Sequence, residues 1–169
     1  MTPAHLHRLD ALAAHRAEVT ARLDALPEAV VHAAPAPGAW SLAQVAEHFV
    51  RIDGFLRLDG PLASPLVRAT SGARRRALCG VLALPIRIPA PPSARAVMPT
   101  AAPRWPDVRD RWAALRAGWR DASPATGAVA YRHPLAGPLL LDDALAFLLA
   151  HHRHHDAQIR RTLRSLDVG

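Results

Sequence analysis

Cysteine is almost missing from this chain of 169 residues, and lysine is missing altogether. The single cysteine, Cys79, excludes an intramolecular disulfide and a cysteine-based zinc site. It lies in the apolar run from Ala77 to Leu84, where we expect a buried, inert thiol rather than a catalytic thiolate. Because lysine is absent, every basic side chain other than histidine is an arginine.

These arginines give the chain a formal net charge of +7. Such a charge raises the question of nucleic-acid binding. The arginines are dispersed, however, and Arg74–Arg76 is the only tight run. No basic and aromatic pattern accompanies them. We therefore interpret the charge as a solvated surface and do not expect a nucleic-acid partner.

Long hydrophobic runs are also lacking. The longest apolar stretch, from Leu78 to Pro85, is far too short to span a bilayer. The N-terminal segment has no apolar core of signal-peptide length. We expect no membrane association, and a reducing cytoplasm fits the composition best.

Aromatic residues make up only 5% of the chain, and glycine, valine and isoleucine are too few to suggest a β-sandwich. Alanine, leucine and arginine dominate, and these residues favour helix. The length fits one domain over residues 1–169 that buries roughly two-thirds of its unfolded surface.

Hydrophobic periodicity predicts four amphipathic helices. Ser41 with Gln44 forms a capping-box pattern for the second helix, and Asp142 is the expected N-cap of the fourth. Trp105, Trp112 and Trp119 are seven residues apart, a spacing typical of a helix core. The predicted ranges are, in chain order, about 3–26, 41–60, 106–118 and 142–166.

The remaining segments connect these helices. A short helix is predicted over residues 74–84. The proline-rich segment 85–103 is predicted to be extended surface chain, and residues 131–139 are predicted to be a linker. Together the patterns predict an all-α protein, a four-helix bundle with long connections.

Four of the ten histidines lie within residues 151–155. His151 and His155 are four residues apart, so on a helix their imidazoles project from neighbouring points of one face. His48 lies among apolar residues of the second helix and should face inward. Three converging imidazoles can bind a divalent cation and leave one coordination position free.

Periodicity alone leaves the choice of ligands open. On the helical wheel His152 lies nearer the centre of the apolar stripe than His151 does. The pair from the last helix is therefore either His151 with His155 or His152 with His155. Histidines at helix contacts are also often only hydrogen-bonded, so a structural role is the alternative to metal binding.

Three ordered elements carry a family resemblance. They are Trp40-Ser followed by His48, then His133-Pro-Leu-x-Gly-Pro-Leu-x-Leu, then His151-x-x-x-His155-x-x-Gln-Ile. Together they resemble the DinB/YfiT-like superfamily. The resemblance implies a four-helix bundle that binds zinc, nickel or iron through His48, His151 and His155, often as a homodimer. It selects His151 over His152.

The resemblance also implies an activity. Relatives include transferases in which a metal activates a low-molecular-weight thiol, so we expect a metal-dependent thiol transferase or a hydrolase. The alternative is a non-enzymatic, stress-related protein that binds metal or a small ligand. The sequence supplies no obvious general base, and no catalytic residue is assigned.

Five further polar residues need an interpretation. His133 precedes a proline, so we predict that it is a turn residue rather than a fourth metal ligand. Gln158 either orients a ligand or packs between helices. Glu47 should be largely solvated, while Asp53 and Asp156 are candidates to bind a histidine of another helix.

Overall fold

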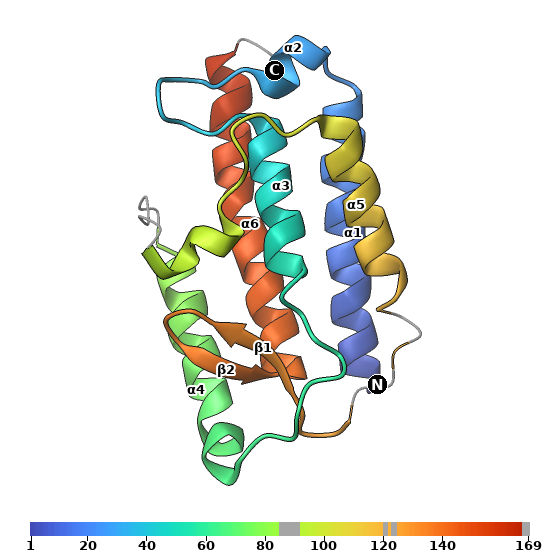
Figure 1. Ribbon diagram of the computed structural model, residues 1–169, viewed down its shortest axis with the longest axis vertical. Coiled ribbons are helices and arrows are strands. Elements are labelled where there is room, and N and C mark those ends of the chain that lie inside the picture. Colours follow the sequence, from blue (N-terminus) through green and yellow to red (C-terminus); the bar gives the residue numbers. More distant parts are fainter. Residues whose placement is uncertain (85–91, 120–121, 123–124, 167–169) are drawn as a thin grey trace.

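The computed structural model describes residues 1–84, 92–119, 122 and 125–166. Four long helices run along the longest axis of the molecule (Figure 1). Helix α6 packs against α1 and α3, and α3 packs against α5. This arrangement confirms the predicted all-α bundle with long connections. The helices are α1 (Pro3–Asp24), α3 (Leu42–Asp53), α5 (Trp105–Ala117) and α6 (Leu141–Ser165).

Helix α3 begins as predicted and ends earlier than predicted. The Ser41 hydroxyl accepts the Gln44 backbone N–H at 3.2 Å, and the Gln44 side chain accepts the Ser41 N–H at 2.9 Å. The helix ends at Asp53 and not near Gly60. The Arg57 N–H donates to the carbonyl of Ala130 in a distant strand, so this N–H is not used to continue the helix.

Two helices lie outside this bundle core, the short α2 (Glu28–His32) and α4 (Pro65–Leu82). Helix α4 is longer than the predicted segment 74–84, because Ser64 caps it and Pro65 occupies its first turn. Its Ser71 accepts the Leu140 N–H at 2.9 Å and donates to Asp143 at 2.6 Å.

That contact explains how α6 starts. The N-cap position is Leu140, whose side chain has no capping group, and the expected cap Asp142 lies in the first turn instead. The backbone N–H of Leu140 is bonded by a hydroxyl from α4, a partner that the local sequence cannot reveal.

The predicted linker around Tyr131 is a β-hairpin, so that prediction is wrong. Strand β1 (Val129–His133) pairs antiparallel with β2 (Gly137–Leu140), and Tyr131 lies opposite Leu139. Gly137 adopts φ 78°, in the left-handed region that glycine tolerates best. A ladder of four to five residues is too short for its periodicity to show in the sequence.

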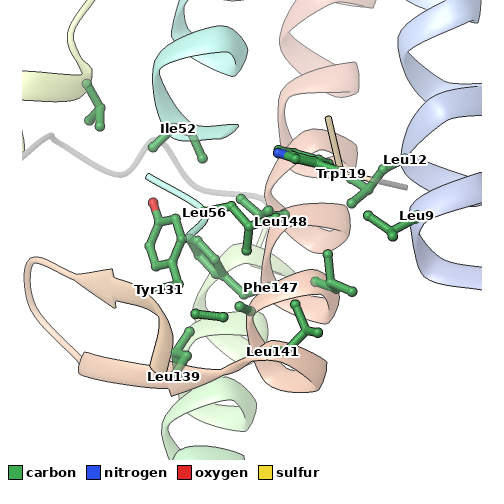
Figure 2. Packing of buried hydrophobic residues seen from close by; sticks show 14 of the residues in the cluster. Leu9, Leu12, Ile52, Leu56, Trp119, Tyr131, Leu139, Leu141, Phe147 and Leu148 are labelled. Atoms are coloured by element: carbon green, nitrogen blue, oxygen red, sulfur yellow. The ribbon is translucent and has the colours of Figure 1, made fainter. Parts of the chain in front are cut away.

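The core has two clusters. One gathers Leu9, Tyr131, Phe147 and Leu148 where the hairpin meets α6 (Figure 2). The other contains Phe49 and surrounds the contact of α3 with α5. All three tryptophans of the predicted stripe are buried: Trp105, Trp112 and Trp119. None of the helices in the described part of the chain has the combination of length and hydrophobicity that a membrane-spanning helix needs.

Candidate metal centre

The structure brings three histidines from two neighbouring helices together. His48 comes from α3, and His151 and His155 come from successive turns of α6. One ring nitrogen of each lies within 4.8 Å of one ring nitrogen of each other residue. In the part of the chain that the structure describes, this is the one group of three such side chains that could hold a metal ion.

Hydrogen bonds fix two of these imidazoles. The Nδ1 of His48 lies 2.7 Å from the carbonyl oxygen of Val97, and the Nδ1 of His155 lies 2.8 Å from Oε1 of Gln158. Both partners only accept, so each Nδ1 carries the hydrogen and each Nε2 keeps its lone pair. Such partners orient metal-binding histidines. Gln158 therefore orients a member of the cluster.

The third imidazole has an orphaned nitrogen. The Nδ1 of His151 is buried and has no hydrogen-bond partner among the described residues. Buried polar atoms are normally paired, so an unpaired one calls for an explanation. A metal ion coordinated by the cluster at this nitrogen would supply one.

Burial keeps the three imidazoles neutral. It lowers the pKa of His48 to about 4, with Arg51 acting in the same direction, and it lowers the pKa of His155 to about 3, with the neighbouring histidines acting in the same direction. Burial and the neighbouring histidines also hold the pKa of His151 well below its usual value. Neutral imidazole is the form that binds metal, so the donor set fits a divalent cation at neutral pH.

Aromatic rings surround the cluster. The Trp40 ring lies 5.0 Å from that of His48 and stacks at 6.3 Å on that of His155. The Phe147 ring lies 5.7 Å from that of His151. These apolar walls explain the strong desolvation of the three rings.

His152 has a different role from its neighbours. It is fully buried, as the helical wheel predicts, but it does not belong to the cluster. Its Nε2 lies 3.1 Å from Asp53, and its Nδ1 lies 3.5 Å from Arg116. Since arginine can only donate, Nδ1 accepts and His152 is neutral, in agreement with the pKa that burial lowers.

Asp53 is the centre of this second, fully buried group. Its carboxylate accepts Trp112 Nε1–H at 2.7 Å and two Arg116 N–H groups at 2.9 and 2.6 Å. Burial alone would raise the pKa of Asp53, but His152, Arg116 and Trp112 together lower it. The candidate role of Asp53 as a partner of a histidine on another helix is confirmed, although that histidine is His152.

Asp156 also binds a histidine of another helix. Its Oδ1 lies 2.8 Å from Nε2 of His15 on α1. No spacing along the chain links His15 with Asp156, because the contact depends on the packing of α1 against α6.

The prediction for Glu47 is wrong. Glu47 is 1% exposed. Its carboxylate accepts hydrogen bonds from the Thr100 N–H at 2.7 Å, from the Thr100 hydroxyl at 2.9 Å and from the Arg51 guanidinium at 3.1 Å. Although burial alone would raise the pKa of Glu47, these bonds lower it. The helical wheel could not show this burial, because a distant segment covers that face of α3.

Three other sequence features have structural roles. His133 is a turn residue as predicted, since its Nδ1 accepts the N–H groups of Leu135 and Ala136 at 3.2 Å. Cys79 is half-buried, and burial raises its pKa, which disfavours a thiolate. In the arginine run, Arg74 donates to a carbonyl of β2 and Arg75 pairs with Asp143.

Comparisons with known proteins give a family. No curated protein and no solved structure matches the chain. A sequence model described as the DinB superfamily matches residues 11–159. That range includes all three clustered histidines, the hairpin and most of α6, so the match covers both the bundle and its candidate site. On this evidence the chain belongs to the DinB superfamily.

Proposed function

We propose that this protein binds one divalent metal ion through His48, His151 and His155 and uses it in catalysis. The supporting observation is the convergence of three neutral imidazoles within 4.8 Å, two of them oriented by hydrogen bonds at Nδ1. Membership of the DinB superfamily supports the same proposal. Zinc, nickel and iron all suit a three-histidine donor set.

The proposed reaction is a transfer to or from a low-molecular-weight thiol, or a hydrolysis. A metal in such a site lowers the pKa of a coordinated thiol or water. The protein would contribute Val97 and Gln158 as partners that hold the ligand rings, and the Trp40 wall that limits access of water. The nearby carboxylates are engaged in ion pairs and are given no role as general base.

Metal content tests the first part of the proposal. Elemental analysis of tag-free protein should give one equivalent of metal for the wild type, and loss of that metal in His48→Ala, His151→Ala and His155→Ala. His154→Ala is the matched control, because His154 lies on the same helix and bonds the Leu82 carbonyl instead. A wild-type protein that stays free of metal after reconstitution would refute the proposal.

Turnover tests the second part. Metal-loaded protein incubated with a small thiol and an alkylating electrophile should form the thioether faster than a metal-free sample does. Hydrolysis of an activated ester in the absence of thiol would distinguish a hydrolase from a thiol transferase. His155→Ala should abolish either rate enhancement, whereas His154→Ala should retain it.

One observation favours a non-enzymatic binder as the second candidate. A hollow of about 600 Å³ is lined by residues such as Leu56, Asp59 and Trp119, and none of the three clustered histidines lines it. A protein that only stores or senses metal needs no substrate space beside the ion. Metal retention without any reaction of thiol or ester would support this candidate.

Two further expectations belong to the proposal. Resemblance to the superfamily suggests a homodimer, which sedimentation would test directly. The composition suggests a cytoplasmic location, which localisation of a tagged chain would test.

A further inference from the structure

One segment between α4 and α5 lies along α3 and bonds to it repeatedly. We call residues 94–101 the strap. It consists of the last four residues of η1 (Pro92–Val97) and the chain that follows toward α5, drawn in yellow-green to yellow in Figure 1. Four α3 side chains at helical spacings of three and four contact it. They are Gln44, Glu47, His48 and Arg51.

The strongest of these contacts lie at two points. Near its end, Thr100 donates its N–H and its hydroxyl to one oxygen of Glu47, at 2.7 and 2.9 Å. Three residues earlier, the Val97 carbonyl accepts from Nδ1 of His48 at 2.7 Å. Gln44 adds bonds to the Thr100 and Ala101 carbonyls at 3.0 and 3.2 Å.

Glu47 is built into this contact. Its Oε2 is used by Thr100, and its Oε1 accepts Arg51 at 3.1 Å and Arg111 of α5 at 3.4 Å. Both oxygens are thus satisfied in a site where the residue is 1% exposed. Charge-assisted bonds of this kind are stronger and shorter than neutral ones. The carboxylate therefore anchors the strap to α3 and α5 at once.

We propose that Glu47 is a positioning residue for His48. By holding Thr100 it fixes the strap so that the Val97 carbonyl meets Nδ1 of His48, and this bond keeps the hydrogen on Nδ1 and leaves Nε2 bare. The role as an aid to metal binding rests on the proposed function. The effect on the His48 ring itself does not.

Glu47→Gln is the test variant, because the amide keeps the size of the side chain and removes its charge. Glu18→Gln is the matched control: Glu18 makes an equivalent i,i+4 pair with Arg22, also at 3.1 Å, on the exposed side of α1. Competition with a zinc chelator should show roughly tenfold weaker binding in Glu47→Gln, within the range known for outer partners of metal ligands. Glu18→Gln should bind as the wild type does.

A second measurement needs no metal. Ring ¹⁵N shifts of His48 in metal-free protein should show hydrogen on Nδ1 in the wild type and in Glu18→Gln, and a mixture of both tautomers in Glu47→Gln. If the wild type binds no zinc but the tautomers still differ in this way, the proposed function fails and the positioning of His48 by Glu47 stands.

Unchanged zinc affinity and an unchanged His48 tautomer in folded Glu47→Gln would overturn the inference. Thr100→Val covers the case in which Glu47→Gln does not fold, since it removes the hydroxyl donor and keeps the backbone N–H. A smaller change in the same direction is then expected. Its absence from both measurements would overturn the inference equally.

Discussion

Four histidines within five residues of α6 make three different sets of contacts. His151 and His155 join His48, while His152 turns to Asp53 and His154 bonds the carbonyl of Leu82. Consecutive residues on a helix point about 100° apart, so neighbours in sequence reach different helices. The cluster is therefore a product of which face each residue occupies, not of the local abundance of histidine.

Asp53→Asn should be among the most damaging single changes. The carboxylate is 0% exposed and is bonded by Trp112, Arg116 and His152. Its neutralisation leaves the buried guanidinium without an anion, and breaking a buried ion pair in this way costs about 3–5 kcal/mol. Urea denaturation of metal-free protein measures the loss in free energy of unfolding.

The control for this change is Asp59→Asn. Asp59 makes a two-point bond with Arg57 at 3.0 Å, but both side chains are exposed. Water replaces such a pair readily, and no measurable change in stability is expected. Equal stability of the two variants would show that the Asp53 group is dispensable.

At the scale of the residue, the sequence predicted the burial of a side chain where the apolar pattern of its own helix determines that burial. His48 faces inward because its neighbours on α3 are apolar, and the burial of His152 follows from the wheel of α6. Choosing His151 over His152 as a member of the cluster needed the family resemblance, since burial does not distinguish a member of the cluster from a partner of Asp53. Glu47 was missed because the strap that buries it comes from residues about fifty positions away.

At the scale of elements, prediction succeeded where periodicity and capping agree. Helices α1, α3, α5 and α6 all carry an apolar stripe over three or more turns, and α3 also has its capping box. It failed where a boundary depends on a tertiary contact. After the end of α3, the Arg57 N–H donates to the Ala130 carbonyl of β1. At the start of α6, the Leu140 N–H donates to the Ser71 hydroxyl of α4.

The hairpin offers a test of the interpretation of His133. His133→Ala removes the acceptor of two turn N–H groups, so the free energy of unfolding should fall by about 0.5–1.5 kcal/mol. Since Nδ1 is occupied by the turn, the metal content should stay at that of the wild type. Urea denaturation and elemental analysis of the same sample check both expectations.

His133→Asn is the companion variant, because its side-chain oxygen can accept the same turn N–H groups. It should recover part of the stability that His133→Ala loses. Loss of metal in both variants, with the fold intact, would show instead that His133 is a fourth ligand.

For the whole molecule, the bundle places a desolvated histidine cluster between α3 and α6, and the strap contacts its member His48. Because the cluster is desolvated, the stability of the metal-free protein decreases at acidic pH. In the unfolded chain His48 takes up a proton near its ordinary pKa of about 6.5, whereas in the folded protein burial delays protonation to about pH 4. Between these values the unfolded state binds more protons, so stability falls as the pH decreases.

The metal-free protein should therefore keep its full His48 contribution above about pH 6.5 and lose about 1.4 kcal/mol for each unit of pH below it. The loss should level off near pH 4, where the folded state also takes up the proton. Carboxylates and the other histidines titrate as well, so the informative quantity is the difference in unfolding free energy between wild type and His48→Gln. That difference should shift steadily against the wild type from pH 6.5 to pH 4. Parallel curves for the two proteins would mean that His48 is already open to water in the folded state, and the cluster would then lack the desolvated, neutral imidazoles on which metal binding is argued.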